Sequence, residues 1–187
     1  PSGNAELDRT LGGGFAPGSL ILLGGDPGIG KSTLVLQTLT TLSAAGLSTL
    51  YVTGEESAVQ LKLRAERLQV AGSSMPLLCE TNLQYILETA RKMHPTVMVV
   101  DSIQTIYRAD LPGTPGSLNQ LRECTLELMV FAKTLNCVVI LVGHVTKEGQ
   151  IAGPRMVEMA PLEAVDIDTE EDFALAAAIA ERSEITT

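Results

Sequence analysis

The sequence has no tryptophan, few other aromatic residues and only three cysteines in 187 residues. Apolar residues make up 45% and aromatic residues 3%, so we expect one domain whose core is Val, Ile, Leu and Ala. No run of about 18 apolar residues occurs, so no membrane-spanning helix is expected. The start, PSGNAELDRT, lacks both an initiator methionine and the features of a secretory signal. These absences predict an excised cytoplasmic fragment with no membrane partner.

The three cysteines, Cys79, Cys124 and Cys137, are widely spaced and lie in apolar stretches. None of them forms a C-x-x-C pair or has a histidine partner, so we expect no zinc in this sequence. An odd number of isolated cysteines is typical of small buried hydrophobic residues in a reducing compartment.

Excess positive charge is also lacking, because the formal net charge is −9. Residues 156–187 carry nine acidic residues and one basic residue, whereas residues 1–155 carry thirteen acidic and twelve basic residues. The acidity therefore belongs to the C-terminal part of the sequence. A nearly neutral remainder leaves polyanion binding open.

Short apolar runs alternate with helix-like segments along the first 143 residues. Five runs are typical of buried strands: residues 19–24, 50–53, 77–79, 96–101 and 137–143. Three pairs have the spacing of a capping box that begins a helix: Ser57 with Gln60, Thr81 with Gln84, and Ser117 with Gln120. This alternation predicts right-handed crossovers, and hence an α/β fold with a mostly parallel twisted sheet and helices on both faces.

The last of these helices is expected to bury one apolar face: Leu118, Leu121, Thr125, Leu128, Ala132 and Leu135. Residues 144–162 contain glycines and prolines and are expected to form a loop. Thr169 precedes an acidic segment that predicts a capped terminal helix. We expect residues 1–158 to form the α/β core and residues 159–187 an acidic tail that need not be native to it.

The clearest chemical signal is a match to G-x-x-x-x-G-K-[ST], the P-loop pattern. It is formed by Gly25, Asp26, Pro27, Gly28, Ile29, Gly30, Lys31 and Ser32, and Thr33 follows it. Glycines let successive amides point at a phosphate, and the following helix N-terminus adds positive potential. Lys31 can reach the β- and γ-phosphate oxygens, and the Ser32 hydroxyl can bind Mg²⁺. The pattern predicts ATP or ADP with Mg²⁺ as the bound species.

Other polar residues follow the predicted strands. Asp101 ends an apolar strand, where a second Mg²⁺ ligand is expected. Glu55 and Glu56 follow residues 50–53, and either can polarise the attacking water or simply be a solvated acid at a helix start; we favour Glu55. His144 ends the last strand and is a candidate sensor of the γ-phosphate, although a structural role is nearly as well supported.

Four stretches, in this order, resemble the bacterial RadA (Sms) family of recombination ATPases, which is related to RecA and to DnaB-type helicases. They are ELDRTLGGGFAPGSLILLGGDPGIGKSTLVLQ, YVTGEES, VVDSIQTIY and GHVTKEGQIAGPR. The resemblance implies a RecA-like core, Mg-ATP hydrolysis, branch migration, a homo-oligomer that is typically a hexameric ring, and single-stranded DNA in its channel. It also implies that Glu55 is the catalytic glutamate and that His144 precedes the second DNA-facing loop.

On the family pattern, residues 107–117 and 145–157 are the two channel loops, and Arg108, Lys147 and Arg155 are their DNA-facing cations. The sequence departs from the family after the second loop. The Lys-Asn-Arg-Phe-Gly motif is missing, and residues 164–180 faintly resemble the C-terminal end of acylneuraminate cytidylyltransferases.

Three functions fit these features. The first is a DNA-dependent ATPase core of the RadA type. The second is a nucleotide-switched assembly module of the KaiC type that acts through protein contacts without DNA. The third is a truncated nucleotide-binding domain with little turnover.

Overall fold

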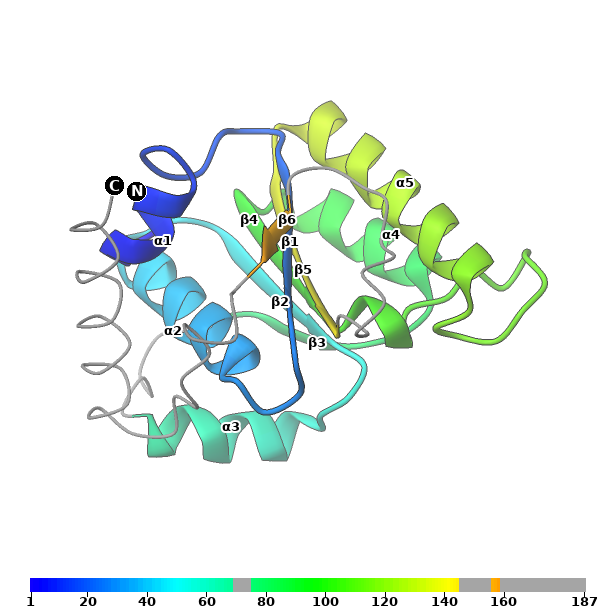
Figure 1. Ribbon diagram of the computed structural model, residues 1–187, viewed down its shortest axis with the longest axis horizontal. Coiled ribbons are helices and arrows are strands. Elements are labelled where there is room, and N and C mark those ends of the chain that lie inside the picture. Colours follow the sequence, from blue (N-terminus) through cyan, green and yellow to red (C-terminus); the bar gives the residue numbers. More distant parts are fainter. Residues whose placement is uncertain (69–74, 145–155, 159–187) are drawn as a thin grey trace.

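The computed structural model describes residues 1–68, 75–144 and 156–158 (Figure 1). The strands and helices follow one another in alternation, as predicted. In chain order the elements are α1 (Ala5–Thr10), β1 (Leu20–Gly25), α2 (Lys31–Ala44), β2 (Thr49–Thr53), α3 (Ala58–Arg67), β3 (Leu77–Cys79), α4 (Leu83–Met93), β4 (Val97–Asp101), the 3-10 helix η1 (Ile103–Thr105), α5 (Leu118–Leu135), β5 (Val138–His144) and β6 (Met156–Glu158).

The strands form one parallel sheet in the order β3-β2-β4-β5-β1-β6. The predicted parallel sheet is confirmed, and its five expected strands are present near the expected bounds. Because all the strands run the same way, their carboxyl ends meet at one edge of the sheet. At that edge Thr53 of β2 pairs with Asp101 of β4, and Gly25 of β1 pairs with His144 of β5.

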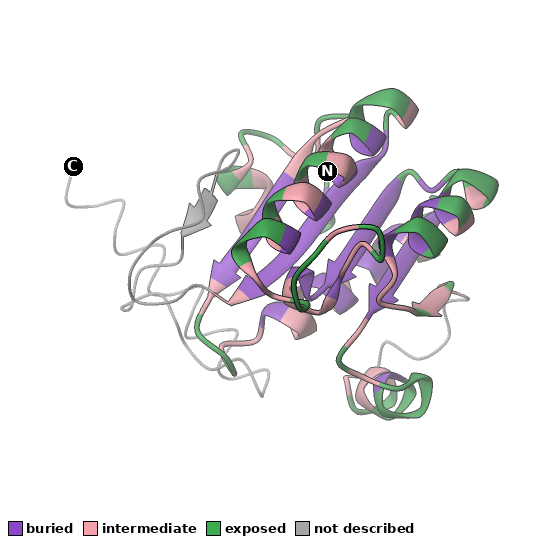
Figure 2. Cartoon of the chain, turned by 90° about the vertical axis from the view of Figure 1, so that its right-hand side faces the viewer, coloured by how far each residue is buried: buried purple, intermediate pink, exposed green. Residues whose placement is uncertain are grey.

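Helices cover both faces of the sheet (Figure 1). Side chains alternate along each strand, so Val97 and Val99 pack with α2 and α3, whereas Met98 and Val100 pack with α4 and α5. Figure 2 shows the buried sheet between helices whose outward surfaces are exposed. Burial on both faces explains why the strands are continuous apolar runs rather than alternating ones.

Two of the three predicted capping boxes are wrong. The box of Ser57 and Gln60 is present at the start of α3. At α4 the capping residue is Asn82, whose side-chain oxygen accepts a hydrogen bond from the amide of Gln84, so Thr81 is not the cap. Ser117 occupies the capping position of α5 without a side-chain capping bond.

Gln120 has a different role from the one predicted. Its buried amide nitrogen donates to the carbonyls of Arg108, Leu111 and Gly113, so it holds the loop before α5 instead of capping the helix. The buried face of α5 is rotated accordingly. The helix buries Gln120, Cys124, Leu128, Phe131 and Ala132. The predicted face is correct for Leu128 and Ala132, which are buried, and for Leu121 and Leu135, which are partly buried against the core. It is wrong for Leu118, which is 67% exposed.

Three further expectations are affected. Residues 144–162 are not wholly a loop, because β6 adds a parallel strand beside β1.

Cys124 and Cys137 are buried as predicted, and burial raises the pKa of their thiols to about 11 and about 12. Cys79 is exposed, contrary to the prediction, because it lies on the edge strand β3. The tail at residues 159–187 and its predicted helix lie outside the described residues.

No helix in the described ranges combines the length and the apolar character needed to cross a bilayer.

Candidate nucleotide-binding site

The predicted phosphate loop connects the end of β1 to the start of α2. Gly30 occupies the N-cap position with φ 89°, a conformation that favours glycine, and α2 has neither a side-chain capping bond nor an acidic residue in its first turn. The first amides of a helix have no partner within the helix. These amides are therefore available to an anion.

Two other glycines fit the same purpose. Gly28 has φ 86°, and no atom of the described residues lies within 4 Å of a Cβ placed there, so these residues leave room for a ligand at the turn. A Cβ at Gly25 would overlap the Cδ1 atom at the end of the Ile29 side chain, which would have to move, so the loop folds closely over this position.

Lys31 begins α2 and is only 5% exposed. Its ammonium nitrogen donates to the carbonyl oxygens of Gly25, at 2.8 Å, and Asp26, at 2.6 Å. Burial lowers the pKa of Lys31 below its ordinary value, and the charges of Asp101, Asp26 and Glu55 oppose that shift. A buried ammonium held mainly by neutral carbonyls suits a strongly anionic ligand such as a triphosphate.

The two predicted magnesium ligands come from adjacent parts of the same edge. Ser32 lies in the first turn of α2, followed by Thr33, and both are half-buried. Asp101 ends β4 and is 5% exposed. One carboxylate oxygen of Asp101, Oδ2, accepts a hydrogen bond of 2.6 Å from the hydroxyl of Tyr51.

These oxygens are suitable ligands for Mg²⁺, but they do not form a complete magnesium site without oxygens from a bound ligand or water. Hydroxyl and carboxylate oxygens are suitable ligands, and Mg²⁺ is usually held by one or two protein groups together with phosphates and water. Within the described residues no group of three or more His, Cys, Asp or Glu side chains is arranged to hold a metal. The donor set therefore suits a magnesium ion that arrives with a nucleotide.

Glu55 is fixed just beyond the end of β2. The hydroxyl oxygen of Thr53 accepts the amides of Glu55 and Glu56, at 3.3 and 3.1 Å, which forms a tight turn. The hydroxyl of Ser102 donates to Oε1 of Glu55. Two neighbouring strands, β2 and β4, thus determine where this carboxylate lies.

The adjacent acid, Glu56, points elsewhere. It forms an ion pair of 2.7 Å with Arg64 of α3. Burial raises the pKa of Glu56 above its ordinary value, and Arg64 opposes this shift. The two carboxylates thus have different partners: Glu55 contacts Ser102 and His144, whereas Glu56 is paired with Arg64 of α3.

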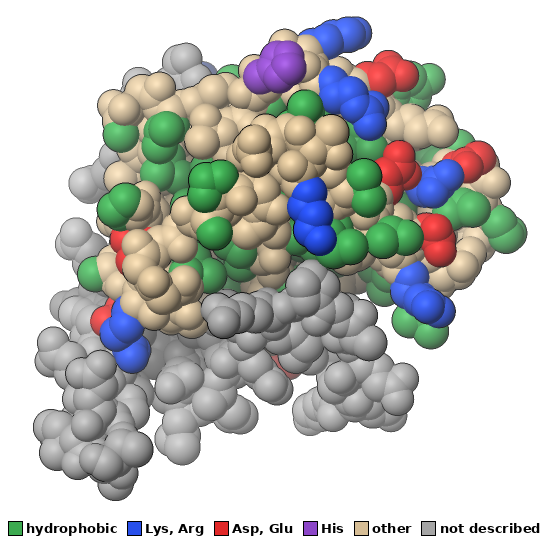
Figure 3. Space-filling model, turned by 90° about the horizontal axis from the view of Figure 1, so that it is seen from above, with side chains coloured by type: hydrophobic (Ala, Val, Ile, Leu, Met, Phe, Trp, Pro, Cys, Tyr) green, Lys and Arg blue, Asp and Glu red, His purple; other side chains and the backbone are tan. Residues whose placement is uncertain are grey.

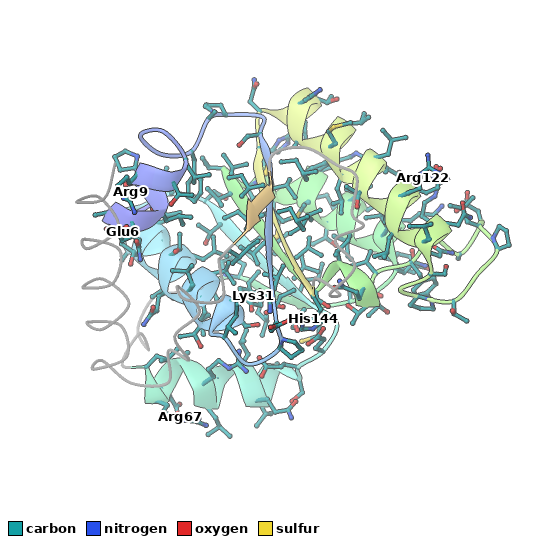
Figure 4. All side chains as sticks on the ribbon, viewed as in Figure 1. Glu6, Arg9, Lys31, Arg67, Arg122 and His144 are labelled. Carbon is teal, nitrogen blue, oxygen red and sulfur yellow. The ribbon has the colours of Figure 1, made fainter. Side chains whose placement is uncertain are left out.

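His144 ends β5 close to Glu55, with 3.6 Å between its Nε2 atom and Oε1 of Glu55. Its carbonyl oxygen accepts a hydrogen bond of 3.1 Å from the side-chain amide of Gln104. Its Nδ1 atom is buried without a hydrogen-bond partner in the described part of the chain. Figure 4 shows that Lys31 and His144 come from different elements, α2 and β5, toward the same end of the sheet.

Sequence reasoning missed four residues of this region: Tyr51, Thr53, Ser102 and Gln104. Tyr51 bonds to Asp101, and Thr53 bonds to the turn that carries Glu55. Ser102 bonds to the carboxylate of Glu55, and Gln104 bonds to the backbone of His144. One available signal was position, because Thr53 ends a strand and Ser102 directly follows one. For Tyr51 the signal was a phenol hydroxyl between two apolar residues, Leu50 and Val52.

The DNA-facing residues proposed from the family pattern are only partly described. The guanidinium of Arg108 bonds to Asp110 at 2.6 Å and lies 3.5 Å from Glu127. Hydrogen bonding to Asp110 raises the pKa of Arg108, and the same bond lowers the pKa of Asp110. Lys147 and Arg155 lie outside the described residues.

The opposite end of the molecule, which carries the amino ends of the strands, has a different surface. Figure 3 shows basic and acidic side chains interspersed over this face, without a large patch of one sign among the residues that the structure describes. The chemistry-bearing residues are instead gathered at the carboxyl edge.

A glycine loop leads from a buried strand into a helix, and acids lie at the carboxyl ends of neighbouring parallel strands. These features define an α/β P-loop domain. Residues 4–150 match the family model described as AAA domain. Since the match covers most of the chain, the chain belongs to this family of ATPase domains.

Curated relatives carry the name DNA repair protein RadA. The chain is 55% identical over 153 residues to the one from Bacillus subtilis (strain 168), covering 82% of this chain and 33% of the relative. It is 56% identical over 153 residues to the one from Streptococcus pneumoniae (strain ATCC BAA-255 / R6), covering 82% and 36%. The resemblance to the RadA family is confirmed, and the chain spans about a third of the length of these relatives.

Among solved structures, one described as an ATPase domain is similar to this chain with a TM-score of 0.65. The match covers 79% of this chain and 64% of that one, at 19% sequence identity. At that identity the likeness concerns the fold alone, and it confirms the predicted RecA-like P-loop fold.

Proposed function

We propose that this chain is the ATP-hydrolysing core of a RadA-type DNA repair protein. The observation that carries the proposal is the meeting of Lys31, Asp101, Glu55 and His144 at one edge of a parallel sheet. Lys31, Asp101 and His144 belong to α2, β4 and β5, and Glu55 lies in the turn after β2. The charges of Asp101 and Glu55 both act on the ammonium of Lys31. Such convergence of a buried cation with carboxylates is typical of a site rather than of a stabilising surface network.

In this proposal the loop from Gly25 to Gly30 and the first turn of α2 hold the phosphates through backbone amides. Lys31 exchanges its two carbonyl partners for phosphate oxygens. Ser32 and Asp101 hold the magnesium ion, which supplies neutralisation of charge on the β- and γ-phosphate oxygens.

Glu55 is proposed to orient the attacking water and to accept its proton. A general base must lie within hydrogen-bond reach of its target in a defined orientation, and Ser102 and the turn at Thr53 supply that orientation. His144 lies beside the same carboxylate and directly precedes residues 145–157, so it can couple the state of the phosphate site to that segment.

Hydrolysis is proposed to be coupled to single-stranded DNA, with branch migration as the outcome in the full-length protein and a hexameric ring as its assembly. The names of the curated relatives support this class of function. Arg108, Lys147 and Arg155 are the proposed phosphate contacts. For Arg108, a DNA phosphate would have to compete with Asp110 and Glu127, since the guanidinium is already paired.

The test is the steady-state release of phosphate from Mg-ATP, with and without single-stranded DNA, for the wild type and Lys31→Ala. We expect turnover that DNA stimulates and that the substitution abolishes. Equal rates in both proteins would contradict the catalytic assignment. Turnover without stimulation would contradict the DNA coupling and would favour an assembly switch.

The alternative is a domain that binds nucleotide but barely turns it over. P-loop sites can require an arginine supplied by a neighbouring molecule. Measurement of molecular mass with and without nucleotide, beside the turnover assay, separates the two. A monomer with tight nucleotide binding and near-zero turnover would support the alternative.

A further inference from the structure

Tyr51 carries a polar group into the apolar interior of the sheet. It lies in the middle of β2, is 0% exposed, and packs in the cluster formed by one face of the sheet with α2 and α3. Burying a hydroxyl is unfavourable unless it is hydrogen-bonded. Phenylalanine would fill the same space without this requirement, so the hydroxyl calls for an explanation beyond packing.

The partner of this hydroxyl is the proposed magnesium ligand. In the register between β2 and β4, Tyr51 is opposite Val99 and Thr53 is opposite Asp101. Since side chains alternate along a strand, Tyr51 and Asp101 project from the same face. The tyrosine therefore reaches along this face to the end of the neighbouring strand, where its hydroxyl donates to Oδ2 of Asp101 at 2.6 Å.

This hydrogen bond has a fixed direction. A phenol hydroxyl carries a proton to donate and an ionised carboxylate oxygen can only accept, so Tyr51 is the donor and Asp101 the acceptor. The other carboxylate oxygen, Oδ1, has no hydrogen-bond partner among the residues that the structure describes. The carboxylate is thus held by one oxygen and leaves the other for a ligand.

We propose that Tyr51 is a positioning residue for Asp101: it holds Oδ2 so that Oδ1 is presented to the magnesium ion of a bound Mg-nucleotide. The inference rests on the proposed nucleotide site and adds a residue to it. Groups that hydrogen-bond a metal ligand orient it, and their loss typically lowers metal affinity by about 10- to 100-fold.

The test compares Tyr51→Phe with the wild type, and uses Tyr85→Phe as the matched control. Tyr85 is 58% exposed on α4, so the same change is made where the hydroxyl is in water. The measurement is the binding of a fluorescent ATP analogue at increasing Mg²⁺, from which the Mg²⁺ concentration at half-maximal enhancement of binding is obtained. Binding without Mg²⁺ and the thermal unfolding midpoint without Mg²⁺ are measured alongside.

We expect Tyr51→Phe to require about tenfold more Mg²⁺ than the wild type, with little change in Mg²⁺-free binding, while Tyr85→Phe matches the wild type. An unchanged or lower Mg²⁺ requirement would overturn the inference. So would an equal loss of binding with and without Mg²⁺, because that pattern indicates a purely structural role.

A double-mutant cycle distinguishes an effect that acts through Asp101 from a general loss of structure. In an Asp101→Asn background, Tyr51→Phe should cause no further change in the Mg²⁺ requirement, because its effect acts through Asp101. An additive effect in the double variant would overturn the inference. If the wild type itself bound no nucleotide, the proposed function would fail instead, and this outcome is distinct from the others.

Discussion

The phosphate loop and the strand-end cluster lie side by side but are built in different ways. The phosphate loop is residues 25–33, a continuous segment whose chemistry comes mainly from backbone amides and one lysine. The strand-end cluster is Glu55, Asp101, Ser102 and His144, which come from the ends of three strands and interact through side chains.

The difference concerns what each part requires of the fold. A loop of contiguous residues needs only its own strand and helix to take shape. The strand-end cluster needs β2, β4 and β5 in the correct order, because Glu55 and Ser102 are 47 residues apart. We therefore expect the loop to determine nucleotide binding and Glu55 with its partner Ser102 to determine turnover, whereas Asp101 acts on the binding of magnesium. Substitutions can separate these effects.

The largest effect is expected from Lys31→Ala. The substitution removes the buried ammonium, and hydrogen bonds to charged groups contribute about 1.5–3 kcal/mol each, so the affinity for ATP should fall about 100-fold or more. Isothermal titration calorimetry with Mg-ATP measures it. Lys62→Ala, at an exposed lysine of α3, is the control and should bind normally. Equal affinities for both variants would contradict the role of the loop.

Glu55→Gln should act on turnover while sparing binding. Glutamine keeps the size of the side chain but cannot take a proton from water, and loss of a general base costs about 100-fold or more in kcat. Phosphate release gives kcat, and calorimetry gives the nucleotide affinity. Glu56→Gln is the matched control, since Glu56 is paired with Arg64. If Glu56→Gln caused the larger loss of kcat, the assignment of the two acids would be reversed.

Ser102→Ala should have a smaller effect of the same kind. The carboxylate of Glu55 remains but loses the hydroxyl that orients it, so we expect kcat to fall about tenfold with nucleotide affinity unchanged. Ser48→Ala, at an exposed serine before β2, is the control for the loss of a hydroxyl. A decrease in affinity without a decrease in kcat would place Ser102 with the phosphate loop and break the comparison.

The smallest effect is expected at Arg108. Asp110→Asn removes the carboxylate charge that pairs with the guanidinium of Arg108 and so leaves this guanidinium freer to bind a DNA phosphate. Because exposed ion pairs contribute little free energy, the affinity for single-stranded DNA should rise only about two- to fivefold. Fluorescence anisotropy at fixed salt measures it. Glu88→Gln, which removes an exposed acid on α4, controls for the change in net charge. Equal increases in both variants would indicate a general charge effect and no role for Arg108.

Much of the fold could be predicted because its signals are local. Apolar runs bounded by glycine or polar residues marked the five strands, and a capping pattern marked the start of α3. The buried face of α5 could be predicted only in part, since the register between a helix and its sheet depends on the loop that enters it. Gln120 holds that loop by three hydrogen bonds, which turns Leu118 outward.

The sequence by itself determined the α/β class, the phosphate loop and the set of acids that could serve it, because these depend on short-range pattern and residue chemistry. Only the tertiary structure decided which groups hold those acids. The hydroxyl of Tyr51 donates to the carboxylate of Asp101, 50 residues away in the sequence. The group that donates to the carboxylate of Glu55 is the hydroxyl of the distant Ser102, and the adjacent Glu56 is not its partner. The physical reason is strand order: a parallel sheet brings distant strand ends to one edge, and the choice of neighbours is made by packing of the whole domain.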